Sequence, residues 1–194
     1  MASASLALGR WLANHWFFPA PAQRLAGTRI LIAAFAVVYL GTRIGYLLAP
    51  LNYADATFDP VGPVGLLPTP LPDAWVYLSV GVALLSGVAF WAGAWFRVTG
   101  PLFAVMLLWV LSYRNSWGMV FHTENLLVLH VLVLGFSPAA DAWSWDQRRH
   151  GTAVDERRVA TGQYAWPLRT MTWLVVIAYD AASGISRQIS RKVV

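Results

Sequence analysis

Five long apolar stretches dominate the sequence, and short polar or proline-rich segments separate them. They span 29–48, 75–96, 99–117, 118–137 and 167–185. Each is close to the ~20 residues that an α-helix needs to cross about 30 Å of hydrocarbon at about 1.5 Å per residue. The third and fourth stretches are continuous, and we divide them at 115–118 because polar and helix-weakening residues cluster only there. The pattern predicts about five transmembrane helices.

The segment before the first stretch, 1–27, has a different character. Its aromatic residues are interrupted by Arg10 and His15, and Pro19 and Pro21 end the pattern. It is predicted to form an amphipathic helix in the membrane interface, with an irregular tail as the alternative. Composition supports a membrane protein, because 58% of the residues are apolar and 12% are charged, against about 25% charged in soluble domains. We therefore predict an all-α, polytopic membrane helix bundle over 28–194, preceded by this interfacial segment.

The charged residues indicate an orientation. The loop 49–74 has three aspartates and no Lys or Arg, whereas 139–166 has four arginines. The positive-inside rule predicts a multi-pass protein of the cell membrane, with the N-terminus and 139–166 in the cytoplasm and the loop outside. Five spans would leave the basic C-terminal residues outside. The last helix is therefore expected to be incomplete or re-entrant, or the chain to be a shortened form of a longer protein.

Polar side chains interrupt the apolar sequence between Ser112 and His130. The candidate ligand-binding residues are Arg114, Asn115, His122, Glu124, Asn125 and His130. A charge at the bilayer centre costs about 2.5–3.5 kcal/mol on insertion scales, so such residues pair with one another or face a wet cavity. At about 100° per residue, His122 and Asn125 share one helix face and Glu124 points to nearly the opposite side. One helix cannot bring all of them to a single site.

Three interpretations of this cluster stay open. In the first, Glu124 is structural and pairs with Arg43, Arg114, Arg169 or a polar neighbour such as His122. In the second, His122 and a carboxylate bind a ligand or handle a proton. In the third, the cluster binds a metal. Helical zinc ligands stand four residues apart on one face, but His122 and His130 are eight apart. The metal interpretation is therefore the weakest of the three, and we predict no metal site.

Several segments carry a family resemblance. They are 24–32, the Leu-Leu-Pro of the outer loop, Ser112-Tyr-Arg-Asn-Ser-Trp-Gly, His122-Thr-Glu-Asn-Leu and Ser137-Pro-Ala-Ala-Asp-Ala-Trp-Ser. Together they resemble the HTTM family, the transmembrane domain related to vitamin K-dependent γ-carboxylases. The resemblance implies an all-helical membrane domain, which in the carboxylases binds reduced vitamin K and uses a lysine base. Arg187 stands where that lysine would fall, and arginine stays protonated at any working pH. Carboxylase chemistry is therefore not expected, and whether the protein is an enzyme stays open.

Two functions follow as hypotheses. The first is a membrane module that binds a lipophilic quinone-type molecule. In it, His122, Glu124 and Asn125 form the polar end of the site and the proline-rich loop 58–72 forms a lid. The second is a non-catalytic accessory or scaffold subunit of a larger membrane complex. Under both hypotheses the protein contacts the lipid bilayer, and under the second it also binds other membrane protein subunits. Neither hypothesis involves nucleic acid.

Overall fold

The computed structural model describes residues 11, 15–118 and 122–193, with the side chains of 122–123 and 181–193 left aside. Within these ranges the protein is all-helical and has no strand. The helices are α2 (Ala22–Thr42), α3 (Ile44–Leu48), α4 (Asp73–Ala92), α5 (Phe96–Asn115), α6 (His122–Gly135), α7 (Trp145–His150), α8 (Glu156–Ala160) and α9 (Ala165–Val193). Three 3-10 turns lie between α3 and α4: Ala49–Asn52, Asp55–Thr57 and Gly62–Leu66.

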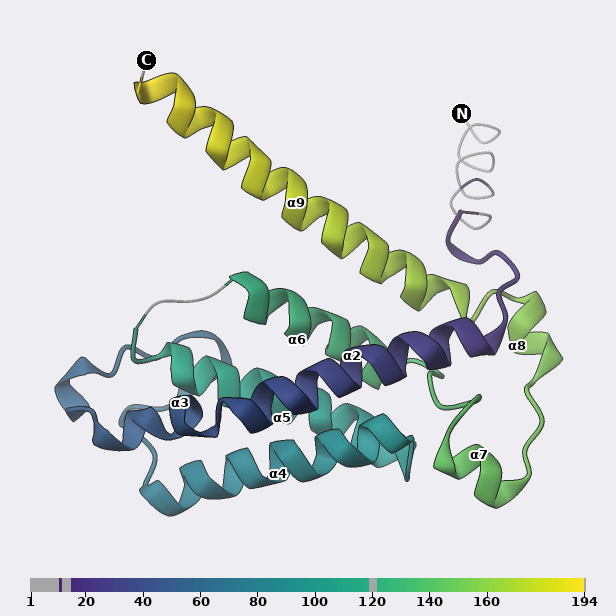
Figure 1. The fold of residues 1–194 in the computed structure, drawn as a ribbon, viewed down its shortest axis with the longest axis horizontal. Coiled ribbons are helices and arrows are strands. Elements are labelled where there is room, and N and C mark those ends of the chain that lie inside the picture. Colours follow the sequence, from purple (N-terminus) through teal and green to yellow (C-terminus); the bar gives the residue numbers. More distant parts are fainter. Residues whose placement is uncertain (1–10, 12–14, 119–121, 194) are drawn as a thin grey trace.

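Helices α2, α4, α5 and α6 form an elongated bundle (Figure 1). Helix α5 packs against both α4 and α6, and α2 packs against the same two helices. The loop 49–72 lies at one end of the bundle, and α7 and α8 lie at the opposite end (Figure 1). Helix α9 starts at the α7–α8 end and leaves the bundle obliquely. The acidic loop and the arginine-rich segment are therefore at opposite ends, as the charge pattern predicted.

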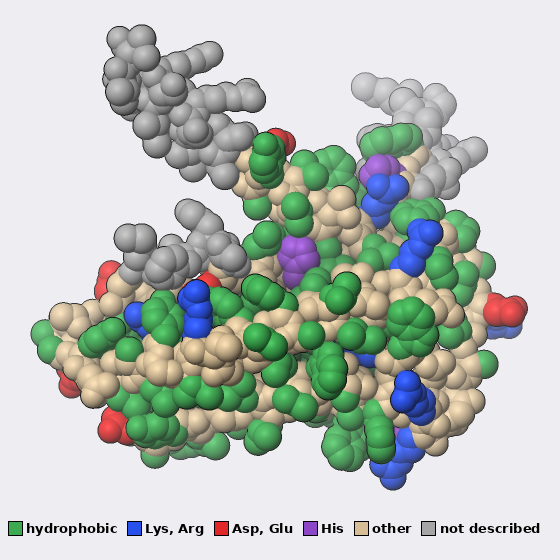
Figure 2. All heavy atoms as spheres, in the orientation of Figure 1, with side chains coloured by type: hydrophobic (Ala, Val, Ile, Leu, Met, Phe, Trp, Pro, Cys, Tyr) green, Lys and Arg blue, Asp and Glu red, His purple; other side chains and the backbone are tan. Residues whose placement is uncertain are grey.

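Three helices are long and apolar enough to cross a membrane, namely α2, α4 and α5. Their outward faces are as apolar as their packed faces, because Leu31, Leu85 and Val105 are exposed on them. Helices that are hydrophobic all round belong in a large core or in lipid. Figure 2 shows apolar side chains spread along the bundle and most of the basic ones in the half of the molecule that carries α7 and α8. The protein is therefore an integral membrane protein.

The first three predicted spans correspond to these helices with shifted ends. Helix α2 begins at Ala22, inside the segment expected to be interfacial, and the chain bends at Arg43 before α3 continues to Leu48. Helix α4 covers Asp73–Ala92 and α5 covers Phe96–Asn115. Trp95 adopts a left-handed conformation with φ of 45° and separates the two helices in a tight turn.

The prediction of about five spans is not confirmed. Helix α6 has 14 residues, which is about 21 Å and less than the ~30 Å of hydrocarbon. Its described part begins at His122, whereas the predicted span began at Gly118, and Ser116–Gly118 form a turn. Helix α9 is longer than its predicted span, and among its side chains up to residue 180 the buried ones lie in the first two turns, up to Met171. Beyond that point its described apolar side chains are mostly exposed.

Two glycines bring α5 and α6 into close backbone contact. A Cβ atom on Gly100 would lie 2.8 Å from the carbonyl oxygen of Gly135, and one on Gly135 would lie 2.6 Å from that of Gly100. Small residues at such crossings are typical of membrane helices, where association depends on close packing. This crossing holds the short α6 against the bundle.

The proline-rich loop folds over one end of α5. Asp59 N donates to Ser116 O at 2.8 Å, Val61 N donates to Ser116 Oγ at 3.1 Å, and Leu71 N donates to Tyr113 Oη at 3.2 Å. Val64 is buried against Val76 and Tyr113 in a small separate core. The proline-rich loop 58–72 therefore packs on this end of α5 and contains one short 3-10 turn, Gly62–Leu66. Its predicted role as a lid stays a prediction.

Candidate functional site

Glu124 is a buried carboxylate with a defined partner. It lies in the first turn of α6 and is 2% exposed. Its Oε1 accepts a 2.6 Å hydrogen bond from the Tyr39 hydroxyl of α2, and that hydroxyl accepts one from Arg43 Nη1 at 3.0 Å. The Arg43 guanidinium carbon also lies 4.5 Å from the centre of the Tyr39 ring. Tyr39 therefore connects a cation to a carboxylate that do not contact directly.

A second arginine completes this group. Arg114, at the end of α5, donates from Nε to the Tyr46 carbonyl at 3.1 Å, and its guanidinium carbon lies 4.0 Å from the Tyr46 ring centre. Arg43 lies on the same ring at 5.8 Å. We call Tyr39, Arg43, Tyr46, Arg114 and Glu124 the Glu124 cluster. It joins α2, α3, α5 and α6 at the loop end of the bundle.

Some buried polar atoms at this end have no hydrogen-bond partner within the described part of the chain. They are Glu124 Oε2, Tyr46 Oη, Asn115 Oδ1 and Trp117 Nε1. An unsatisfied buried donor or acceptor costs about 1–3 kcal/mol. Native structures retain few such atoms. This end of the bundle can therefore make further hydrogen bonds to a small polar group.

The prediction that Glu124 has a polar partner is confirmed, but Tyr39 was missed. Tyr39 and Arg43 stand four residues apart on one helix face, and this spacing was an available signal. Asn125 is exposed while its neighbour Glu124 is buried, as the helical geometry predicted. Arg169 instead lies over the Phe18 ring at 5.0 Å. The His122 side chain is outside the described residues, so interpretations that depend on it stay predictions.

His130 belongs to a different site. Its Nδ1 lies 2.7 Å from the Leu126 carbonyl oxygen of its own helix. A carbonyl only accepts, so Nδ1 carries the proton and Nε2 is the nitrogen left for a ligand. The residue lines a cavity of about 290 Å³ between α2, α6 and α9. We call this the His130 groove, and its lining is Thr28, Ile32, His130, Leu168, Met171, Thr172 and Val175.

A buried arginine organises the opposite end of the bundle. Arg29 of α2 is fully buried, and it donates from Nη1 to Ala139 O at 3.1 Å and from Nη2 to Trp143 O at 2.8 Å. Gly93 passes so close that a Cβ atom there would lie 2.6 Å from Arg29 Nη1. The burial of Arg29 was not predicted, because an arginine near the start of an apolar stretch is usually a solvated loop charge.

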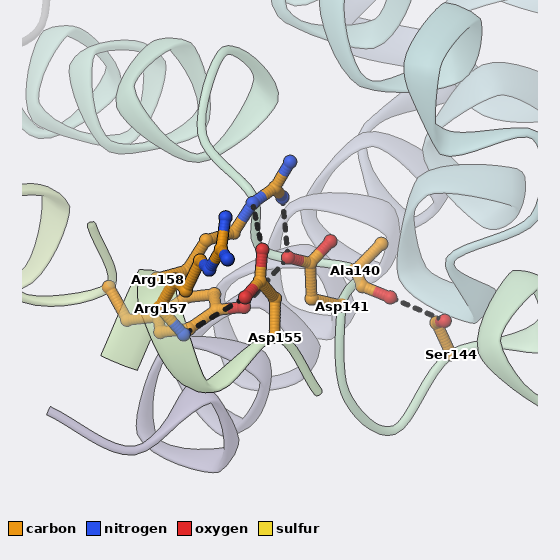
Figure 3. Close-up of polar contacts among 7 residues, drawn as sticks. Ala140, Asp141, Ser144, Asp155, Arg157 and Arg158 are labelled. Carbon is orange, nitrogen blue, oxygen red and sulfur yellow. Dashed lines mark hydrogen bonds and ion pairs between the residues drawn. The ribbon is translucent and has the colours of Figure 1, made fainter. Parts of the chain in front are cut away.

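The segment after α6 is held by further polar contacts, some of which Figure 3 shows. The Asp141 carboxylate accepts from Arg158 Nη1 at 2.7 Å and from the Tyr164 hydroxyl at 2.8 Å. The hydrogen bond to Asp141 raises the pKa of Arg158. Burial is the larger cause of the raised pKa of Tyr164, and its hydrogen bond to Asp141 is the second. Ser144 Oγ donates to Ala140 O at 2.6 Å (Figure 3). It also caps α7 by accepting from Gln147 N.

A cavity of about 270 Å³ opens beside this segment. We call it the Trp groove, and it is lined by Ile30, Trp91, Ala92, Trp143, Ser144, Trp145 and Arg148. Asp146 anchors the nearby turn, because its two carboxylate oxygens accept from Trp95 N and Phe96 N, both at 2.8 Å. Trp143 and Trp95 are the described non-glycine residues with positive φ, at 49° and 45°.

No protein-family model matches the chain, and no curated protein or solved structure matches it at a significant level. Among the described residues, no group of three His, Asp or Glu side chains is close enough to hold a metal ion.

Proposed function

We propose that this integral membrane protein binds a lipophilic quinone-type molecule whose polar ring lies in the His130 groove. The observation that carries the proposal is the fixed imidazole. Because Nδ1 donates to Leu126 O, Nε2 is an acceptor in the neutral ring. The hydroxyl of a reduced quinone is a matching donor. His130 thus takes over the role that the sequence first suggested for the neighbourhood of Glu124.

The groove has the composition that such a ligand needs. Ile32, Leu168, Met171 and Val175 provide apolar walls. The hydroxyls of Thr28 and Thr172 donate to carbonyls of their own helices, so their oxygens can still accept. The volume of about 290 Å³ is at the lower limit of ligand sites, at about 300 Å³. It fits a ring, while an isoprenoid tail would lie in the surrounding lipid.

The Glu124 cluster supports this site without forming it. Glu124 Oε1 is taken by Tyr39, and Asn125 points away to the exposed face. We propose that the cluster fixes α6 against α2, which sets the position of His130 about two turns further along α6. We also propose, from the resemblance of its sequence, that the protein is related to the HTTM family. From the arginines of 139–166 we propose that the α7–α8 end lies in the cytoplasm.

Purified protein should retain quinone extracted from the membrane, and His130→Leu should reduce the retained quinone several-fold. Asn125→Leu is the matched control, because it lies on the same helix, is exposed and does not line the groove. It should retain quinone at the level of the unmodified protein. Equal quinone content in all three proteins would refute the proposal.

A second function has an observation of its own. Beyond Met171, α9 exposes Trp173, Val175, Val176, Ile177 and Tyr179 as it leaves the bundle (Figure 1). Such a face suits an accessory or scaffold subunit that packs against another membrane protein. Native mass spectrometry of the protein in mild detergent tests this, since a partner should dissociate when Ile177 is changed to Glu. A monomer that carries only small molecules would count against it.

A further inference from the structure

We propose that the Trp groove binds one anionic phospholipid, with the phosphate at Arg148 and the first part of an acyl chain against Trp91, Trp143 and Trp145. This site is separate from the His130 groove, which α2, α6 and α9 form. It lies at the end of the bundle that carries α7 and α8, between α2, α4 and α7.

The walls of the groove are aromatic and partly exposed. Trp91, Trp143 and Trp145 are 46%, 55% and 57% exposed. Tryptophan favours the boundary between hydrocarbon and head groups, where its ring meets lipid and its N–H meets water. Three such rings around one cavity give an amphiphile an apolar surface at head-group depth. A free inorganic anion has no apolar part that could pack against these rings.

The backbone at Trp143 is strained. Trp143 has φ of 49°, a left-handed conformation that side chains other than glycine rarely adopt. Arg29 stabilises it from the buried side by donating to the Trp143 carbonyl at 2.8 Å. The buried guanidinium therefore fixes an exposed tryptophan in the groove. Strained positions that the surrounding structure enforces concentrate at functional sites.

The charge at the groove mouth selects the lipid class. Arg148 lines the cavity, is exposed and makes no ion pair within the described part of the chain. Arg149 is its neighbour in the same helix, and Figure 2 shows basic side chains gathered at this end. Arginine binds phosphate with two parallel hydrogen bonds. Asp146, two residues before Arg148 in α7, already accepts hydrogen bonds from the backbone N–H groups of Trp95 and Phe96.

The test compares lipids with the same acyl chains and different head groups. Phosphatidylglycerol or phosphatidylcholine is added to the purified full chain in detergent, and native mass spectrometry measures the first bound lipid. We expect the unmodified protein to prefer phosphatidylglycerol by about tenfold, a factor that one charge-assisted contact supplies. Arg148→Gln should lose this preference, whereas Arg149→Gln, which changes the same charge outside the groove, should keep it.

A second variant tests the aromatic wall. Trp143→Gly removes the ring and suits the positive φ, so the fold should be retained, as thermal melting will show. We expect it to weaken the first binding event for both lipids several-fold. The proposal is overturned if Trp143→Gly binds both lipids normally, or if Arg148→Gln and Arg149→Gln behave alike. It is also overturned if inorganic phosphate alone displaces the lipid, since the site would then recognise only the anion.

Discussion

The hydroxyl of Tyr39 and the carboxylate of Glu124 form a 2.6 Å hydrogen bond that ties α2 to α6. Glu124 is 85 residues away in sequence and is almost completely buried. Burying a carboxylate costs free energy unless it is hydrogen-bonded, and the Tyr39 hydroxyl supplies the donor for Oε1. The bond therefore holds α6 against α2 at a buried position.

Changing Glu124 tests this hydrogen bond. Glu124→Gln should be tolerated better than Glu124→Leu, because the amide oxygen still accepts from Tyr39 while leucine leaves the phenol without its acceptor. We expect the leucine variant to lose about 1–3 kcal/mol, the cost of an unsatisfied buried polar group. Thermal unfolding in detergent micelles measures the difference. If Glu124→Leu unfolds at the same temperature as Glu124→Gln, the hydrogen bond contributes nothing.

The crossing of α5 and α6 depends on Gly100 and Gly135. Gly100→Ala should destabilise the protein by about 1–3 kcal/mol, the usual cost of overpacking, because its Cβ would meet backbone that cannot turn aside. Gly81→Ala in α4 is the control, since nothing lies within 4 Å of a Cβ atom there. It should instead gain about 0.5–1 kcal/mol from helix propensity. Equal melting temperatures for the two variants would contradict the close crossing.

Gly93 and Gly151 provide a matched pair of left-handed glycines, with φ of 67° and 59°. Alanine at either position carries a backbone cost of about 1–2 kcal/mol. Only at Gly93 would the Cβ collide, 2.5 Å from Ser144 Cβ and 2.6 Å from Arg29 Nη1. Gly93→Ala should therefore lower the unfolding temperature well below that of Gly151→Ala. Similar losses would mean that Arg29 has room to move.

Tyr164 should make the protein sensitive to high pH. Burial and the hydrogen bond to Asp141 raise the pKa of Tyr164 above its ordinary value of 10.0. Its contribution to stability is complete below pH 10.0 and is lost as the pH rises toward the folded pKa, because the unfolded chain releases the proton first.

The unfolding temperature should therefore fall less steeply above that pH in Tyr164→Phe than in the unmodified protein. Melting curves recorded in steps from neutral to alkaline pH measure this. The other tyrosines titrate in both proteins and cancel in the comparison. Parallel curves would show that the hydroxyl keeps no proton beyond its ordinary range.

The sequence by itself determined the membrane class, the helices α2, α4 and α5 to within a few residues at most ends, and the opposite placement of acidic loop and basic segment. It also determined that Glu124 needs a polar partner. These properties depend on composition and on spacing along one helix, which local chemistry sets. The length of apolar sequence was a poorer guide for α6 and α9, because a run of apolar residues does not show where a turn shortens a helix or where it leaves the bundle.

The tertiary structure decided which side chains meet. Tyr39 is the partner of Glu124 only in the packed bundle. The sequence of a single helix does not determine how that helix is rotated against its neighbour. The same packing placed His130 in a groove with residues of α2 and α9. It also buried Arg29 where its guanidinium donates a hydrogen bond to the Trp143 carbonyl. Contacts between residues this far apart in sequence depend on the close approach of backbones, such as that at Gly100 and Gly135, which only the folded bundle provides.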